Sequence, residues 1–412
     1  MRDTQARRSV AIRGLPIFLA ILFMVAAACR RDQALPGPSG DAQAPSHSAV
    51  TAAPPVDLRL DNGFAFAAGL PADSPSFAAW QEEPAWRDYA AAAGKAWEEF
   101  DNAVLGPIRS WATDDLGAVR ARTTTLFYPF GGPDFATAFA LFPDARATVL
   151  LGLEPAGDLP DFGRIQAEGR AAFYADLEAL TLDFLTRGYF ITKQMMETFS
   201  RGNVHGALPV IGFFLKRGGC SIIDVRHLTP NAAGGWLETS HQRTTMRVRR
   251  PYGVRIDYLK PGDAAFRSVY YFSCDVEDRA FKEGSPLHRF FQGFERMATF
   301  VKAGSYLLHW NNFSILRRLI LDRSLFVLQD DTGIPYRVLK GLGWDIRLFG
   351  RYATPVKDFT NVEQEDLRQA YEGPETSAEP LPIRFGYRWV TRVDNLLLAE
   401  RPRRPYKVPV MK

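Results

Sequence analysis

The largest concentration of residues that could do chemistry is the stretch LFVLQDDTGIPY, residues 325–336, where Asp330 and Asp331 directly follow an apolar, strand-like run. Ligands of an open α/β sheet sit beyond the carboxyl ends of its strands, so at least one of these carboxylates should face that crevice. Paired carboxylates there could bind a cation, orient a water or hold sugar hydroxyls. A turn that caps a helix beginning at Ile334 would use the same residues, and both interpretations stay open.

His309 is the next candidate, because it ends the predicted strand SYLLH and could share the same rim with Asn311 and Asn312. Asp275, after the strand-like run YYFSC, is a further rim candidate. A single histidine is more often structural than catalytic. The 6 histidines show no spacing typical of metal ligands, so we expect no metal site.

A glycine pair, Gly131 and Gly132, ends the strand-like part of LFYPFGGPDF, residues 126–135. Glu154 follows Gly132 by 22 residues, at the end of a second apolar run. A strand, a turn, a short helix and a second strand within about 30 residues predict a βαβ unit and a parallel sheet. The turn and the later acid resemble the cofactor-binding segment of dinucleotide-binding enzymes and class I methyltransferases, which implies a nucleoside pocket at these residues.

The residues after the glycine pair disfavour a phosphate ligand. The pattern G-x-G-x-x-G requires glycine where this chain has Pro133 and Ala136. Pro133 offers no N–H group, and Asp134 places a carboxylate where the helix dipole would otherwise attract a phosphate. We expect Asp134 to cap the following helix. The turn therefore resembles the first motif of methyltransferases, which need no phosphate-binding site, more closely than it resembles a dinucleotide site.

The first residues predict the cellular compartment. Four arginines precede an apolar run from Leu15 to Ala28. At about 1.5 Å per helical residue this run spans about 21 Å, well short of the ~30 Å hydrocarbon core of a bilayer. We therefore interpret residues 1–28 as a signal peptide rather than a membrane span.

The end of this run, VAAAC, resembles the lipobox of bacterial lipoproteins, with Ala26 in place of the preferred leucine. In that family the chain is cut before the cysteine, so the resemblance implies that Cys29 is lipidated and anchors the mature protein. Arg30 in place of an aspartate implies transit to the outer membrane, with the body facing the periplasm. An ordinary secretory cut and an uncleaved anchor stay open, and Arg7-Arg8 is faintly similar to a twin-arginine signal, which exports folded proteins.

Three parts follow the signal peptide. Residues 29–56 are rich in Pro, Ala, Ser and Gly and should be a disordered tether. Residues 57–118 should form a helical segment, with an amphipathic helix from Pro84 to Leu105. Residues 119–412 should form an α/β body, with a division near residue 240 if it contains two modules.

The expected fold class is α/β, with a mixed, mainly parallel, Rossmann-like sheet. Strand-like runs alternate with helix-like runs at the spacing of βαβ units. Between residues 244 and 276, segments in which polar and apolar residues alternate are interrupted by the turn sequences Pro-Tyr-Gly and Lys-Pro-Gly-Asp. This pattern predicts antiparallel hairpins added to the sheet. Helices are predicted over residues 165–187, 190–217 and 287–302, and strands over Cys220 to Leu228 and over SYLLH, LFVLQDD and DIRLFGRY.

The mature chain should be almost neutral. Residues 1–28 contain four arginines and one aspartate, so the 50 basic and 46 acidic residues of the whole chain fall to 46 and 45. Net charge therefore gives a nucleic-acid partner no support. A cationic stretch with Arg247, Arg249, Arg250 and Arg255 is most simply explained as a solvated strand face that blunts a sheet edge, and the alternative is a site for an anionic lipid or glycan.

Besides Cys29, the chain contains only Cys220 and Cys274. In an oxidising periplasm the two could form a disulfide, which would stabilise the fold by about 4 kcal/mol in the chain-entropy model. Two separate buried thiols on strands are the alternative.

The chain contains none of the patterns G-x-S-x-G, H-E-x-x-H, S-x-x-K and C-x-x-C, and no P-loop. The sequence motifs of common hydrolases and zinc enzymes are therefore absent from it. We interpret the protein as a lipid-anchored cell-envelope protein with a non-catalytic binding or assembly role. No cofactor is expected, because nucleotide-type cofactors are scarce outside the cytosol. The alternative is an enzyme, either methyltransferase-like with a pocket at Gly131 and Gly132 or a carboxylate-dependent hydrolase that uses Asp330 or Asp331.

Overall fold

The computed structural model describes residues 55–187, 204–240, 252–355, 357–374, 377–384, 386–388 and 394–402. All of them belong to one compact unit, residues 41–412. The predicted signal peptide, Cys29 and all but the last residues of the tether lie outside this described part, as do Arg247, Arg249 and Arg250. No helix among the described residues combines the length and the apolar content that a membrane span needs.

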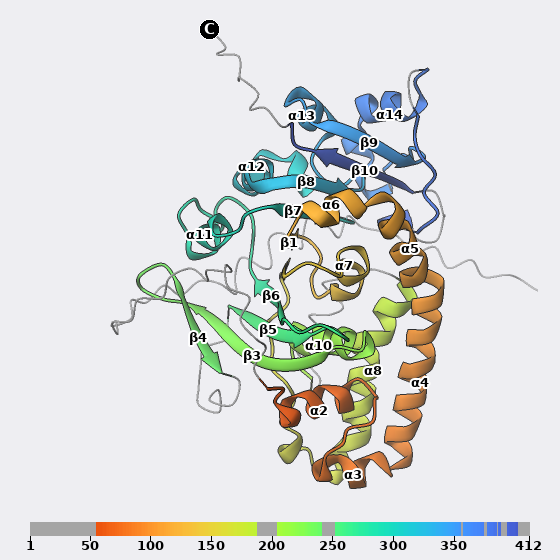
Figure 1. Ribbon diagram of the computed structural model, residues 1–412, viewed down its shortest axis with the longest axis vertical. Coiled ribbons are helices and arrows are strands. Elements are labelled where there is room, and N and C mark those ends of the chain that lie inside the picture. Colours follow the sequence, from red (N-terminus) through yellow and green to blue (C-terminus); the bar gives the residue numbers. More distant parts are fainter. Residues whose placement is uncertain are drawn as a thin grey trace, which may run out of the picture. The chain divides into compact units, whose positions relative to one another are not determined.

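The chain folds as an α/β protein around one mixed sheet of 10 strands, as the sequence predicts (Figure 1). The strand order is β4-β3-β5-β6-β2-β1-β7-β8-β10-β9. The strands are β1 (Thr125–Tyr128), β2 (Ala147–Gly152), β3 (Ser221–Pro230), β4 (Trp236–Ser240), β5 (Gly253–Leu259), β6 (Arg267–Ser273), β7 (Met297–Val301), β8 (Ser324–Gln329), β9 (Asp345–Gly350) and β10 (Asn395–Glu400).

The centre of the sheet is a doubly wound arrangement. β6, β2, β1, β7 and β8 pair in parallel with one another. β10 is antiparallel to both β8 and β9, so β9 runs in the same direction as β8. In chain order these six same-direction strands lie as 3-2-1-4-5-6, the arrangement of Rossmann sheets, with β10 inserted between the last two. The strand order reverses between β1 and β7, which is where such sheets bind ligands.

Helices cover both faces of the sheet and bury two hydrophobic clusters. Along β1, Leu126 and Tyr128 point into one cluster and Phe127 into the other, as the alternation of a strand requires. The first cluster, here the N-terminal core, contains residues of α2 (Leu58–Ala67), α3 (Pro75–Gln81), α4 (Pro84–Phe100), α5 (Gly106–Asp115), α6 (Gly117–Arg122), α7 (Phe135–Leu141), α8 (Arg170–Arg187) and α10 (Ala207–Arg217). The second, the C-terminal core, contains residues of α11 (Pro286–Gln292), α12 (Ser314–Arg323), α13 (Tyr336–Gly341) and α14 (Glu365–Glu372).

The amphipathic helix predicted from Pro84 is α4, which runs beside α8 in Figure 1. Pro84 occupies its first turn, where a missing N–H costs nothing. Trp86, Tyr89 and Ala93, at helical spacing, are buried in the N-terminal core. The tryptophans of this segment therefore pack the helix against the body.

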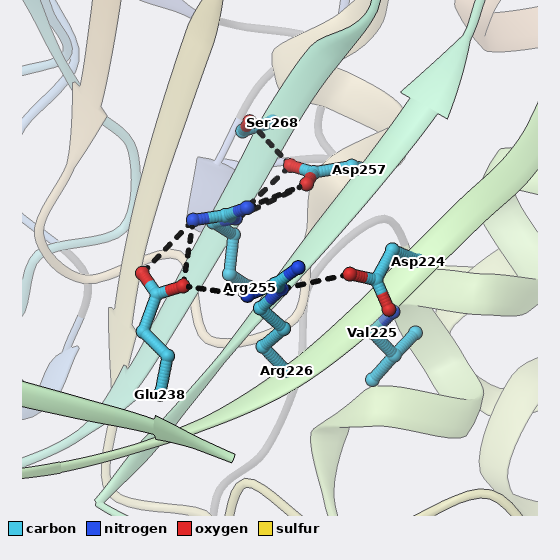
Figure 2. A network of polar contacts seen from close by, with 7 residues as sticks. All are labelled: Asp224, Val225, Arg226, Glu238, Arg255, Asp257 and Ser268. Atoms are coloured by element: carbon cyan, nitrogen blue, oxygen red, sulfur yellow. Dashed lines mark hydrogen bonds and ion pairs between the residues drawn. The ribbon is translucent and has the colours of Figure 1, made fainter. Parts of the chain in front are cut away.

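The antiparallel end of the sheet carries a polar network on the face opposite α2 and α10 (Figure 2). Arg255 on β5 donates to both carboxylate oxygens of Glu238 on β4, at 2.9 Å each, and to Asp257 at 2.8 Å. Ser268 on β6 donates to Asp257 at 2.6 Å. Such cross-strand pairs stabilise a sheet. Arg255 is therefore bound inside the protein and is not available to an external anion.

The helix predicted over residues 287–302 is confirmed only as far as Gln292, and the predicted strand SYLLH is wrong. α11 ends at Gln292, and β7 occupies Met297–Val301 between β1 and β8. Arg296, with φ of 54°, turns the chain between the two elements. Pairing with two neighbouring strands decides the structure of this apolar run, which its own sequence pattern cannot do. The SYLLH residues form the loop after β7, which ends in a 3₁₀ turn at Leu307–His309.

Cys220 and Cys274 are free thiols in this structure, and both are buried. Cys220 belongs to the N-terminal core and Cys274 to the C-terminal core, so the sheet separates them. Burial raises the pKa of the Cys220 thiol to about 12. Of the two alternatives left by the sequence, the structure contains two separate buried thiols.

Candidate functional site

The edge of the sheet at the reversal of strand order is built from the segments that follow four parallel strands. Gly131 and Gly132 follow β1, Glu154 follows β2, Lys302 follows β7, and Asp330 follows β8. Because these strands run in the same direction, their carboxyl ends meet at one edge of the sheet. The loops therefore bring together residues that lie up to about 200 positions apart in the chain.

Glu154 packs against the glycine turn. Gly132 has φ of 53°, and a Cβ atom on it would lie 3.5 Å from Glu154 Oε2. The Tyr271 hydroxyl of β6 donates to the main-chain oxygen of Glu154 at 2.8 Å and to its Oε2 at 3.2 Å. Only 1% of Glu154 is exposed. The acid that the sequence assigns to a ribose is thus close to the glycine pair, but its carboxylate is bound within the protein.

A buried ion pair occupies the start of α7. Asp134 is the N-cap of that helix, as the sequence predicts, and its Oδ1 accepts the Thr137 N–H at 3.1 Å. Its Oδ2 accepts from Lys302 Nζ at 2.5 Å and from the Tyr128 hydroxyl at 3.1 Å. The side chains of Lys302 and Asp134 are 5% and 2% exposed. The helix N-terminus that would hold a phosphate therefore already holds an acid and its cation.

The loop after β7 has an unusual backbone. Ala303, Ser305 and Tyr306 have φ between 51° and 56°, a region that non-glycine residues rarely adopt. Each such residue costs on the order of 1–3 kcal/mol, and surrounding contacts must hold it in place. Asp330 Oδ2 accepts the Ala303 N–H at 2.9 Å, and Thr332 Oγ1 accepts the Gly304 N–H at 2.6 Å. The segment after β8 therefore clamps the loop after β7.

Asp330 has this clamping role instead of the predicted helix cap. Its Oδ1 accepts from the main-chain N–H of Thr332 at 3.0 Å and from the Thr332 hydroxyl, whereas α13 begins only at Tyr336. Burial, and then the charge of Asp331, raise the pKa of Asp330 to about 7, and its hydrogen bonds act in the opposite direction. Asp330 therefore exists in both protonation states near neutral pH.

Asp331 and His309 lie beside this clamp. The Tyr306 hydroxyl donates to Asp331 Oδ2, and the Asp331 N–H donates to Asn395 Oδ1 at 2.9 Å. Burial lowers the pKa of His309 to about 4, against the opposing effect of Asp331. The Nε2 atom of His309 is buried and has no hydrogen-bond partner among the described residues. His309 is therefore neutral at physiological pH.

A segment near the C-terminus closes over the same loop. The Tyr387 hydroxyl donates to the Ala303 carbonyl oxygen at 2.9 Å, so the Ser305 hydroxyl, 2.6 Å away, donates to Tyr387. Gly386 has φ of 60°, and a Cβ atom there would lie 2.6 Å from Asp330 Oδ2. No sequence signal predicted that residues 386 and 387 reach this site.

The remaining rim candidates do not join this cluster. Asp275 accepts the Glu277 N–H at 2.9 Å within its own turn. Asn312 is exposed and donates to Glu277 Oε1 at 2.7 Å. Asn311 is exposed. Of the residues that the sequence placed around His309, Asp331 is the one whose charge acts on the imidazole.

A surface cleft of about 1180 Å³ lies elsewhere, between α13, β9 and α14. Its lining includes Arg337, Lys340, Ile346 and Asp366, and none of the strand-end candidates described above. Asp330, with a pKa near 7, could exchange a proton at neutral pH. Its two oxygens, however, face protein donors and Gly386 rather than this cleft.

Within the described ranges, no three His, Cys, Asp or Glu side chains are grouped so that they could hold a metal ion. No protein-family model, curated protein or solved structure matches the chain. The residues of the site and of the leader therefore carry the proposal that follows.

Proposed function

We propose that the protein is a lipid-anchored cell-envelope protein with a non-catalytic binding or assembly role, built on a Rossmann-like sheet without the usual cofactor. The observation that carries the non-catalytic role is the buried Lys302–Asp134 pair at the reversal of strand order. A doubly wound sheet binds its cofactor there, at the N-terminus of the helix that follows β1. A phosphate would meet a carboxylate, and moving Lys302 away would leave that carboxylate buried without a cation.

The remaining parts of a nucleoside pocket are also occupied. Glu154 fills the space beside Gly132 and is held by Tyr271. A ribose hydroxyl that used Glu154 would have to displace this hydrogen bond in a site that is almost completely buried. The methyltransferase-like alternative therefore requires a rearrangement of both sides of the turn.

The first prediction concerns cofactors. S-adenosylmethionine, S-adenosylhomocysteine, NAD or FAD, added singly at about 1 mM, should leave the thermal unfolding midpoint of the mature protein unchanged. A ligand present at 100 times its Kd would stabilise the fold by about 2.7 kcal/mol, which is readily measured as an upward shift. A shift with one of them that disappears in the Glu154→Ala variant would contradict the non-catalytic proposal and favour the methyltransferase-like one.

The second prediction concerns the anchor, and the signal sequence supports it. In cells supplied with labelled palmitate, the wild-type chain should carry the label and fractionate with membranes. The Cys29→Ser variant should lose the label and leave the membrane fraction, because Cys29 is the residue that the lipobox marks. The Cys220→Ala variant is the matched control and should stay labelled. Membrane retention of Cys29→Ser, together with an unlabelled wild type, would rule out the lipid anchor.

A further inference from the structure

We propose that the cleft between α13, β9 and α14 binds an extended polypeptide segment with acidic side chains, which adds as a strand to the outer edge of β9. The cleft is lined by Tyr336 and Lys340 of α13, Ile346 and Leu348 of β9, and Gln369 of α14. Its volume of about 1180 Å³ exceeds what a typical small-molecule pocket offers. This inference concerns a different site from the crevice above and does not depend on the lipid anchor.

β9 offers unpaired backbone groups to the cleft. It is the last strand of the sheet and pairs with β10 on one side only. On its outer side, Leu348 O accepts the Glu379 N–H and the Gly350 N–H donates to Glu379 O, both at 2.8 Å. Alternate residues of a strand face the same side, so the N–H and C=O of Ile346 and the N–H of Leu348 also point outward. No described residue pairs with these three groups.

The single bridge at Glu379 covers only the carboxyl-terminal half of this edge. No described residue pairs with the outer side of the half that begins at Asp345, where it borders the cleft. An open edge is a template for another strand, and extended peptides use such edges in several binding proteins. The backbone of β9 therefore supplies donors and acceptors at the spacing of a strand.

The charges in the cleft select an acidic partner. Arg337 and Lys340, three positions apart on the exposed side of α13, form no ion pair with a described acid. The other cations of the lining are already paired, Arg347 with Glu379 at 2.7 Å and Arg368 with Glu372 at 2.8 Å. An incoming strand thus meets two cations that form no ion pair with a described acid.

One acid in the lining is also without a partner. Asp366 Oδ2 is buried and accepts no hydrogen bond from a described residue. Asp366 lies on α14 and lines the cleft, but this oxygen is closed to an incoming strand. A phosphate or a lipid headgroup would use the two cations but would gain nothing from the edge of β9. The combination of groups therefore favours a polypeptide.

The probe is the fluorescein-labelled peptide TVEVEVTV, called the Glu peptide. One comparison peptide is TVKVKVTV, called the Lys peptide. The other is the Glu peptide with N-methyl groups on alternate residues. At low salt, fluorescence anisotropy should show the Glu peptide binding about tenfold more tightly than the Lys peptide. The N-methylated Glu peptide should bind at least about tenfold more weakly, because it cannot pair with the outward groups of Ile346 and Leu348. This comparison leaves the protein unchanged, so misfolding of a variant cannot explain the result.

Two variants test whether the cations of α13 and the edge of β9 bind the peptides. Arg337→Glu/Lys340→Glu should reverse the preference to the Lys peptide. Ile346→Pro removes one N–H group that points outward and keeps the N–H groups that donate to β10. It should therefore weaken the binding of both peptides. Arg87→Glu/Lys95→Glu, at two other exposed positions on α4, changes the net charge by the same amount and should have no effect.

Four results would overturn the proposal. The first is no anisotropy change with up to about 1 mM protein, and the second is equal binding of the Glu and Lys peptides. The third is undiminished binding of the N-methylated peptide, and the fourth is full displacement of the Glu peptide by inorganic phosphate at matched ionic strength, which would indicate a simple anion site. Concentration-dependent dimerisation that Ile346→Pro abolishes would show instead that a second copy of the chain is the occupant.

Discussion

Replacing Lys302 with methionine should lower the free energy of unfolding by about 3–5 kcal/mol. The substitution keeps the length of the side chain but leaves Asp134 buried, with only the Tyr128 hydroxyl and the Thr137 N–H as donors. An isolated carboxylate in such a place must either remain charged at a large desolvation cost or take up a proton. Chemical denaturation monitored by circular dichroism measures the difference.

Two further variants make this first expectation specific. Lys302→Met combined with Asp134→Leu should recover part of the loss, because a buried ion pair that is replaced by apolar groups is often close to neutral. The recovery is incomplete because the Thr137 N–H and the Tyr128 hydroxyl lose their acceptor. Arg318→Ala breaks an exposed pair with Glu283 and should cost less than about 1 kcal/mol. If Lys302→Met also costs less than about 1 kcal/mol, the pair is not shielded from water, and the main support for a closed crevice is lost.

The second large effect is on the pH dependence of stability, and Asp330 and His309 should act in opposite directions. The pKa of Asp330 rises from 3.8 to about 7 on folding, so the folded state holds its proton more tightly. Its contribution to stability is present below pH 3.8 and is lost as the pH rises through 7, by on the order of 4 kcal/mol. The pKa of His309 falls from 6.5 to about 4. Its contribution is present above pH 6.5 and is lost as the pH falls through 4, by on the order of 3 kcal/mol.

The two contributions overlap in the same pH range and largely offset each other in the wild type. Single substitutions should expose them. In His309→Gln, the unfolding free energy should fall, relative to wild type, as the pH is raised from 4 to 7, because Asp330 then acts alone. In Asp330→Asn it should rise over the same range. Urea denaturation at a series of pH values measures both slopes, and parallel curves for the two variants would show that these groups are not perturbed as described.

Local sequence signals were sufficient for one half of the site. Pro133 followed by Asp134 predicts a capped helix and no phosphate, and Asp134 does cap α7. The spacing of Gly132 and Glu154 predicts that the two lie at neighbouring strand ends, and they do. Each of these relations is contained within a single βαβ unit, whose geometry is fixed by short connections.

The other half of the site depends on pairing between distant segments. Lys302 lies at the end of MATFV, a wholly apolar run that fits a buried strand or part of a helix equally well, so the sequence placed it on a helix. Asp330 looks like a local cap, and its role as a clamp becomes visible only when the loop of Ala303 is next to it. No local pattern predicts that Tyr387 reaches the same loop.

The position of β10 has a consequence for biosynthesis. It is the last strand among the described residues, yet it fills the gap between β8 and β9. A ribosome-bound or truncated chain that ends before residue 394 lacks the partner for both of these strands and exposes two open edges. Pairings over such long stretches of chain are slow to form, so the sheet can be completed only after the residues of β10 have been synthesised.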